Sequence, residues 1–401
     1  MRLFVLSAVA GLTGAGCYRS FLRTPDDASV DGAAVRDGGA DAGTDAGTDA
    51  GPPTCCTNWV FAARVPIEGF GERETVTPRL IVLGDAPAVV VTGPSDPVGP
   101  SGAHLIRLSR DLSTQGAPVA VTRGSFTWGQ PASSGDRFAV CWGADGANVA
   151  RLYDANGAPV SDVVTLDEDV RSPCVDAAYS EGTFAFAYSS RAPDGSNTLR
   201  VRLLDAATFV RGPAVDVGFT AEPQPASLVD TPGGFALAVA GFYAPFIAFD
   251  RAGASRVDSR APSSRRVRLV RGIDGLQLLR VMGHEIPPDR IGDFWFRQSY
   301  DDTTLAPIGP EMDVATYDPY PSPLFDATTD DCGSPMLGTS VPSLMRVESS
   351  GLTEFLPDAP SPGVLRGDTS VLVLGTDAYV AFSAGSPNPR VQIDHWVCVG
   401  E

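Results

Sequence analysis

Seven cysteines carry the most specific chemistry in this sequence: Cys17, Cys55, Cys56, Cys141, Cys174, Cys332 and Cys398. Cys17 follows Gly14, Ala15 and Gly16 at the end of an apolar N-terminal segment, which is the setting for acylation of a cysteine. The other six are an even number, and in an exported chain this predicts up to three disulfides. The count alone leaves their pairing open.

The cysteines do not have the spacing of a metal site. Neither a CxxC nor an HxxxH pair occurs, and the only histidines, His104, His284 and His395, are far apart in the chain. Zinc sites need such close pairs, so we predict neither a metal site nor a cofactor.

Arginines are concentrated in one segment of an otherwise acidic chain, between Arg256 and Arg271. Arg265, Arg266, Arg268 and Arg271 partly alternate with apolar residues, so one face of a strand would present guanidinium groups. An anionic sugar, a lipopolysaccharide phosphate or an acidic partner would suit such a face. The alternative is a polar strand face whose arginines pair with neighbouring aspartates.

Three carboxylates near residue 315 are candidates for acid–base chemistry. Glu311, Asp313 and Asp318 could form the pair that glycoside hydrolysis needs, or they could lie in a solvated loop. Nucleophile elbows, HExxH helices and glycine-rich nucleotide loops are missing from the sequence. All 30 basic residues are arginine, which excludes lysine-dependent catalysis. No catalytic residue is therefore predicted.

Net charge limits the classes of partner. A formal charge of −18 argues against nucleic acid, because phosphate binding needs an excess of cationic side chains. Mutual repulsion favours a soluble monomer.

The N-terminal region indicates where the protein goes. Residues 1–16 have the short charged start and apolar stretch of a signal peptide, and residues 17–54 form a linker rich in Asp, Gly and Ala that cannot bury enough apolar surface to fold. This arrangement resembles the predicted lipoproteins of myxobacterial type, with a lipobox-like Cys17 and an Asp-Ala-Gly tether. The resemblance implies export and lipid anchoring at the outer membrane or cell surface.

We predict that residues 55–401 form a single β-propeller-like repeat domain. With 43 Gly and 34 Pro, the chain favours short strands and turns. A turn followed by an alternating apolar strand recurs about every 48 residues, a spacing typical of propeller blades. Its apolar anchors are Ala88, Phe138, Phe184, Phe235, Leu276, Met336 and Tyr379. Seven blades fit best, and six blades with the region of Cys332 as an insertion is the alternative.

Two further patterns accompany the repeat. After most copies, an Asp and a later Gly separate two short β-runs, which predicts a hairpin at Asp111, Asp154, Asp205, Asp250 and Asp301, with Glu348 in the corresponding place of a sixth. Before several copies, a proline at 78, 131, 173 or 225 opens a run that we expect to be the innermost strand of a blade.

The two ends of the domain should meet in one blade. Three strands end the chain, and residues 58–65 are a spare strand that can complete their sheet. Cys55 or Cys56 should then bond to Cys398 and the other to Cys332, leaving Cys141 to pair with Cys174.

These features predict a cell-envelope lipoprotein whose propeller binds or scaffolds a ligand, either a surface glycan or a protein, without catalysis. The alternative is a carbohydrate-active enzyme, a glycoside hydrolase or lyase, on the same fold.

Overall fold

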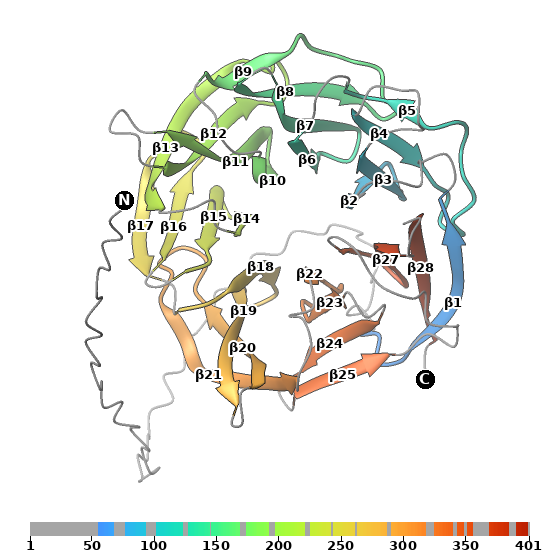
Figure 1. Cartoon of the computed structure of the whole chain (residues 1–401), viewed down its shortest axis with the longest axis vertical. Helices are drawn as coiled ribbons and strands as arrows, with labels where there is room; N and C mark the ends of the chain where they lie inside the picture. The colour runs from blue at the N-terminus through green and yellow to red at the C-terminus, as the bar shows by residue number, and fades with distance from the viewer. Residues whose placement is uncertain are drawn as a thin grey trace, which may run out of the picture. The chain divides into compact units, whose positions relative to one another are not determined.

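The computed structural model describes residues 55–67, 77–93, 102–122, 127–144, 146–168, 174–191, 197–220, 225–241, 244–260, 263–286, 290–317, 325–339, 343–348, 351–355, 369–384 and 390–399. All of them lie in one compact unit, residues 51–401. Their strands form seven four-stranded antiparallel sheets arranged as a ring (Figure 1). The protein is therefore a seven-bladed β-propeller, and the six-bladed alternative is wrong because the region of Cys332 forms a complete blade.

Each blade begins with an inner strand. The inner strands of blades 1 to 7 are β2 (Thr77–Leu83), β6 (Thr127–Ser133), β10 (Cys174–Ser180), β14 (Ala226–Thr231), β18 (Arg266–Gly272), β22 (Phe325–Thr329) and β26 (Ser370–Leu374). Each contacts the inner strand of the next blade, and β26 contacts β2, so the circle is complete. Pro78 and Pro131 lie within inner strands and Pro225 directly before one, as the sequence predicted. Pro173 lies outside the described residues.

The second strands carry the repeated phrase. They are β3 (Ala86–Gly93), β7 (Arg137–Ala144), β11 (Thr183–Arg191), β15 (Gly234–Val239), β19 (Gly275–Ile286), β23 (Pro335–Thr339) and β27 (Asp377–Ala384). All seven predicted anchors lie in these strands and are buried. The apolar clusters join the second strand of one blade to strands of the next, so the core lies between neighbouring sheets.

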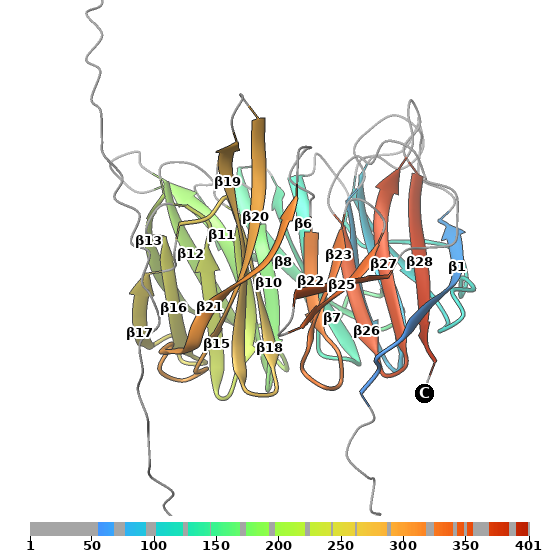
Figure 2. The ribbon, with the colours of Figure 1, turned by 90° about the horizontal axis from the view of Figure 1, so that it is seen from below.

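The outer half of each blade completes the sheet. The third strands are β4 (Gly102–Arg107), β8 (Ala147–Asp154), β12 (Asn197–Asp205), β16 (Pro245–Asp250), β20 (Arg290–Tyr300), β24 (Leu344–Glu348) and β28 (Arg390–Cys398). The outermost strands of blades 1 to 6 are β5 (Val119–Ala120), β9 (Val164–Asp167), β13 (Arg211–Thr220), β17 (Ser255–Arg260), β21 (Pro307–Tyr317) and β25 (Gly351–Phe355). Figure 2 shows the blades from the side, standing next to one another.

The predicted aspartate turns join third to fourth strands. Asp154 Oδ1 accepts hydrogen bonds from the N–H groups of Asn156 and Ala158 at 2.9 and 2.8 Å, while Gly157 adopts a φ of 83°. The turn at Asp250 repeats this geometry. These carboxylates are thus structural, as the recurrence of the motif indicated.

Two of the turns differ from the sequence prediction. After Asp205 and Asp301, the left-handed residue is Phe209 or Leu305, with φ of 53° and 52°. The later glycines of the predicted Asp–Gly pattern are Gly212 and Gly309, which lie within β13 and β21, and of the two Gly309 has a positive φ, 71°. The side chain of the aspartate accepts two backbone N–H groups in each turn, which holds an otherwise disfavoured conformation.

The first and last strands of the domain pair with each other in blade 7. Strand β1 (Trp59–Pro66) pairs antiparallel with β28, from Trp59 opposite Cys398 to Pro66 opposite Gln392. Arg64 donates to Asp394 of β28 through Nε and Nη2, at 2.6 and 2.8 Å, and the Asp394 side chain is fully buried. The predicted closure is confirmed.

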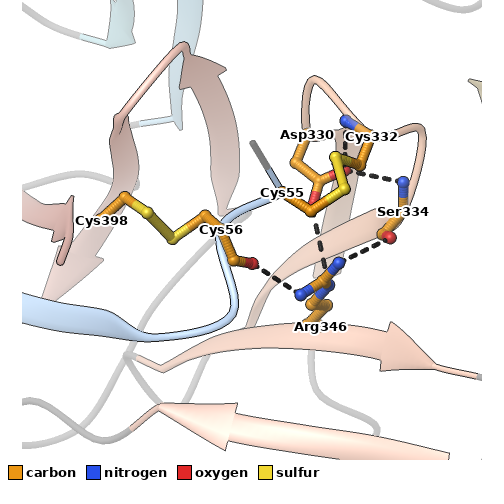
Figure 3. The surroundings of a disulfide bond; sticks show 7 residues. All are labelled: Cys55, Cys56, Asp330, Cys332, Ser334, Arg346 and Cys398. Carbon is orange, nitrogen blue, oxygen red and sulfur yellow. Dashed lines mark hydrogen bonds and ion pairs between the residues drawn. A yellow bond between two sulfur atoms is a disulfide. The ribbon is translucent and has the colours of Figure 1, made fainter. Parts of the chain in front are cut away.

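Three disulfides form in the expected pairs: one lies within blade 7, and two join neighbouring blades. Cys55 bonds to Cys332 in the β22–β23 turn, and Cys56 bonds to Cys398 at the end of β28, with Cα–Cα distances of 5.5 and 5.7 Å (Figure 3). Between them, the guanidinium of Arg346 donates to the backbone oxygen of Cys56 at 2.6 Å. The third disulfide joins Cys141 of β7 to Cys174 of β10, across the interface between blades 2 and 3.

Residues 1–54, which include the predicted signal peptide, Cys17 and the acidic linker, lie outside the described residues. Within the part of the chain that is described, no helix has the length and apolarity needed to cross a membrane.

Candidate functional site

The arginine-rich segment lies at the inner circle of the ring. Only its second half does so: Arg256 and Arg260 lie on β17, the outermost strand of blade 4. The four arginines predicted to bind an anion lie at β18, the inner strand of blade 5, with Arg265 exposed just before it and Arg266 half-buried at its start. Arg268 and Arg271 line a hollow of about 280 Å³ between the inner strands of blades 3 to 6. We call this space the axial hollow. Its other lining residues are Asp176, Ser227, Leu228, Val229, Asp230, Leu269, Val270, Asp326, Ala327, Thr328 and Thr329.

Both arginines of the hollow are in ion pairs with the neighbouring blades. Arg268 Nε lies 3.1 Å from Asp326 Oδ1 of β22, and Arg271 Nη1 lies 2.9 Å from Asp230 Oδ2 of β14. The sequence left two interpretations of these arginines open, and the ion pairs favour the structural one. Anion binding by Arg265, Arg266, Arg268 and Arg271 stays a prediction.

Asp176 is the carboxylate of the hollow that burial affects most. Its Oδ2 accepts the N–H of Leu228 at 2.8 Å and its Oδ1 accepts the N–H of Ala177 at 3.0 Å. Burial raises the pKa of Asp176 above its ordinary value, against the attraction of the Arg268 charge. The side chain is thus a hydrogen-bonded group of the wall that can gain a proton more readily than a solvated aspartate.

One layer of polar side chains encircles the axis, with one residue from each inner strand. Pairing with the second strands places these seven residues at equivalent positions: Arg79, Gln130, Asp176, Ser227, Arg268, Asp326 and Ser370. We call them the polar layer.

The polar layer binds each blade to the next by a repeated hydrogen bond. A side-chain oxygen of one layer residue accepts the N–H that follows the layer residue of the next blade. Asp176 accepts from Leu228, Ser227 from Leu269 at 2.9 Å, and Ser370 from Leu80 at 3.0 Å. Asp326 likewise accepts from Val371 at 3.3 Å. Because an inner strand has a sheet neighbour on one side only, these bonds satisfy N–H groups that the sheet leaves open.

The remaining interfaces depart from this rule for chemical reasons. The side chain of Arg79 cannot accept a hydrogen bond. The residue that would donate to it in the next blade is Pro131, which has no N–H. Instead Arg79 Nε donates to Gln130 at 3.1 Å. The N–H of Ala177 is capped by Asp176 of its own strand.

The last N–H group of this circle belongs to Ala327. The polar-layer residue of the preceding blade is Arg268, whose side chain cannot accept a hydrogen bond. Among the described residues, no side chain accepts the N–H of Ala327, whereas that group is capped at Leu80, Leu228, Leu269 and Val371. Ala327 also lines the axial hollow.

Two of the three carboxylates predicted as candidates for acid–base chemistry are described, and neither lines the axial hollow. Glu311 and Asp313 are on β21, the outermost strand of blade 5. Glu311 receives a two-point ion pair from Arg280, with Nε to Oε1 at 2.6 Å and Nη2 to Oε2 at 2.5 Å, and Arg280 also stacks on Phe296. Asp318 lies outside the described residues. The structure thus brings Glu311 together with an arginine rather than with a second acid.

His395 of β28 contacts two side chains of β27. Its Nε2 lies 2.7 Å from Asp377 Oδ1, and its ring stacks on Tyr379 at 5.0 Å. The described residues contain no group of three or more His, Cys, Asp or Glu side chains arranged to hold a metal ion.

Sequence reasoning missed the polar layer and the carboxylates of the hollow. The available signal was a polar residue near the start of each inner strand, once per repeat. It was hard to see because the residue type changes from blade to blade.

Comparison with known proteins supports the fold and no more. No protein-family model matches the chain, and no curated protein matches it in sequence. Among solved structures, the chain is similar to one titled Kuenenia stuttgartiensis hydrazine synthase, at 12% identity and a TM-score of 0.56, covering 82% of this chain and 96% of that one. It is also similar to the Dos1 propeller, at 10% identity and a TM-score of 0.50, covering 86% and 96%. At these identities the likeness identifies a β-propeller.

Proposed function

We propose that this protein is an exported, lipid-anchored propeller that binds a small polar ligand, such as a unit of a surface glycan, in its axial hollow. The observation that carries the proposal is the hollow itself, whose walls come from four blades. Ion pairs between blades hold four of its charged groups, and two backbone N–H groups hold Asp176. Pre-positioned polar groups in a concave site are what ligand recognition needs.

The anchoring part of the proposal rests on Cys17 and on the disulfides. Three disulfides are expected in an oxidising compartment outside the cytoplasm. Cys17→Ala should abolish incorporation of labelled fatty acid and release the protein to the soluble fraction. Unchanged membrane partition of this variant would contradict lipid anchoring.

The binding part is tested with a glycan array. Thr328→Trp adds a bulky ring to a residue that lines the hollow and should abolish binding. Val210→Trp is the matched control, because Val210 is 63% exposed in the turn between β12 and β13 and does not line the hollow. Binding that survives Thr328→Trp would place the ligand elsewhere, and an array without any bound glycan would remove the glycan proposal.

One observation favours a second candidate, a carbohydrate-active enzyme. Asp176 combines a raised pKa with a position in the wall of the hollow, and a carboxyl group that keeps its proton can act as a general acid. A panel of chromogenic glycosides separates the candidates. Turnover that is lost in Asp176→Asn while binding persists would support the enzyme, and binding without turnover supports the binding protein.

A further inference from the structure

The charge of the axial hollow indicates which ligands it accepts. Asp176, Asp230 and Asp326 contribute three carboxylates, whereas Arg268 and Arg271 contribute two guanidinium groups. Each guanidinium already has a carboxylate partner at 3.1 Å or less. An anionic ligand would therefore have to compete with these carboxylates or lie beside them, and either costs free energy.

The wall of the hollow also provides both hydrogen-bond donors and hydrogen-bond acceptors. The N–H of Ala327 is a donor that no described side chain uses, and Thr328 and Thr329 line the hollow next to it. Asp176 accepts one backbone N–H on each oxygen, and a carboxylate oxygen can accept more than one hydrogen bond. Such a wall matches hydroxyl groups, because each of them donates and accepts at once.

Resting on the proposed function, we propose that the axial hollow selects an uncharged sugar unit. One sugar hydroxyl oxygen accepts the N–H of Ala327, and another hydroxyl donates to Asp176. The two Arg–Asp pairs are polar walls of the site rather than receptors for an anion. The volume of about 280 Å³ lies at the lower end of small-molecule sites, so the hollow fits a terminal unit of a glycan rather than a long stretch of chain.

The first experiment compares matched ligands by titration calorimetry. Methyl glycosides of glucose, galactose and mannose are each measured beside the corresponding uronide and 2-amino sugar. The neutral sugar of at least one series should bind about tenfold more tightly than its uronide, because the uronide places an unpaired carboxylate beside Asp176 or Asp326. Its affinity should not change with salt concentration. Tighter binding of a uronide or of a 2-amino sugar, weakened by salt, would overturn the inference while leaving a ligand-binding propeller in place.

The second experiment removes the Ala327 N–H alone. Ala327→Pro does so in a strand whose equivalent position in blade 2 is already Pro131, so the fold accommodates proline there. Losing one hydrogen bond to an uncharged ligand should weaken binding of the neutral sugar about 2- to 10-fold, with the melting temperature little changed. Equal affinity in Ala327→Pro would refute the contact.

The two proposals fail in different ways. If no sugar of any series binds to the wild-type protein, or if Thr328→Trp binds as the wild type does, the site itself is wrong. If Thr328→Trp abolishes binding but Ala327→Pro does not alter it, the site stands and the assigned contact is wrong.

Discussion

The buried pair of Arg64 and Asp394 should decide how firmly the ring is closed. It joins β1 to β28, Asp394 is fully buried, and the guanidinium of Arg64 also lies over the rings of Phe61 and Phe382. Arg64→Met keeps an apolar stem but leaves the carboxylate without its partner, and breaking one side of a buried ion pair costs about 3 to 5 kcal/mol. Urea unfolding at neutral pH, followed by tryptophan fluorescence, measures this loss.

The loss should depend on pH in a defined direction. Burial already raises the pKa of Asp394 above its ordinary value, while Arg64 lowers it, so Arg64→Met should raise it further. A carboxyl group with a raised pKa in the folded state favours folding below its unfolded pKa, and this contribution is lost as pH rises through the folded pKa. The cost of Arg64→Met should therefore be greatest at neutral pH and shrink as the solution becomes more acidic than the folded pKa of Asp394.

Two controls separate charge from packing. Replacing both partners, as Arg64→Met with Asp394→Leu, should recover most of the stability, since apolar residues of similar volume often replace a buried pair at little cost. Arg251→Met removes an exposed partner of Glu181, and surface pairs contribute only about 0 to 1 kcal/mol. A cost of Arg64→Met no larger than that of Arg251→Met, without pH dependence, would refute the reasoning.

Three further predictions concern the polar layer, a turn and a disulfide. Ser370→Ala removes the acceptor of the Leu80 N–H and should cost about 1 to 3 kcal/mol in thermal or urea unfolding, because the N–H stays buried; a neutral result would mean that water replaces the hydroxyl. Hydrogen bonds from Ser109 and then Ser113 lower the pKa of Asp111 to about 2. In the double variant Ser109→Ala with Ser113→Ala, an NMR titration should find the pKa of Asp111 closer to its ordinary value, and an unchanged pKa would contradict this cause. Removing the Cys141–Cys174 disulfide by paired alanine substitutions should cost about 3 to 4 kcal/mol from the loop that it closes, and a much smaller loss in urea unfolding would show that the unfolded chain is already compact.

The sequence predicted the propeller because second strands are covered on both sides. Phe138, Phe184 and Phe235 each lie in the middle of a sheet and between two blades, so their positions demand apolar residues in every repeat. The closing strand was also predictable, since a ring with three strands left at its end needs a fourth. The burial of second strands acts in the same way on every blade, and the need to close the ring acts once, on blade 7.

The candidate site was only partly predictable, because its contacts join different residue types in different blades. Arg268 forms an ion pair with Asp326, and Arg271 with Asp230, each across a blade interface. The two pairs have different separations in the chain, so no repeated spacing predicts them. The role of Ser227 depends on where the N–H of Leu269 lies, which follows from sheet register rather than residue type. The partner of Glu311 was not predictable either, because Arg280 lies on β19, which is not adjacent to β21 in the chain.

The adjacent cysteines at the start of the ring also set an order of events during synthesis. Cys56 leaves the ribosome 342 residues before its partner Cys398, and Cys55 leaves 277 residues before Cys332. Cys141 and Cys174 are only 33 residues apart and can be oxidised while the chain is still growing. Cys55 must therefore stay reduced, or be exchanged out of wrong pairs, until the turn between β22 and β23 is made, and Cys56 until β28 is made. Correct maturation of this protein should accordingly depend on a disulfide isomerase in addition to the oxidant that forms the three bonds.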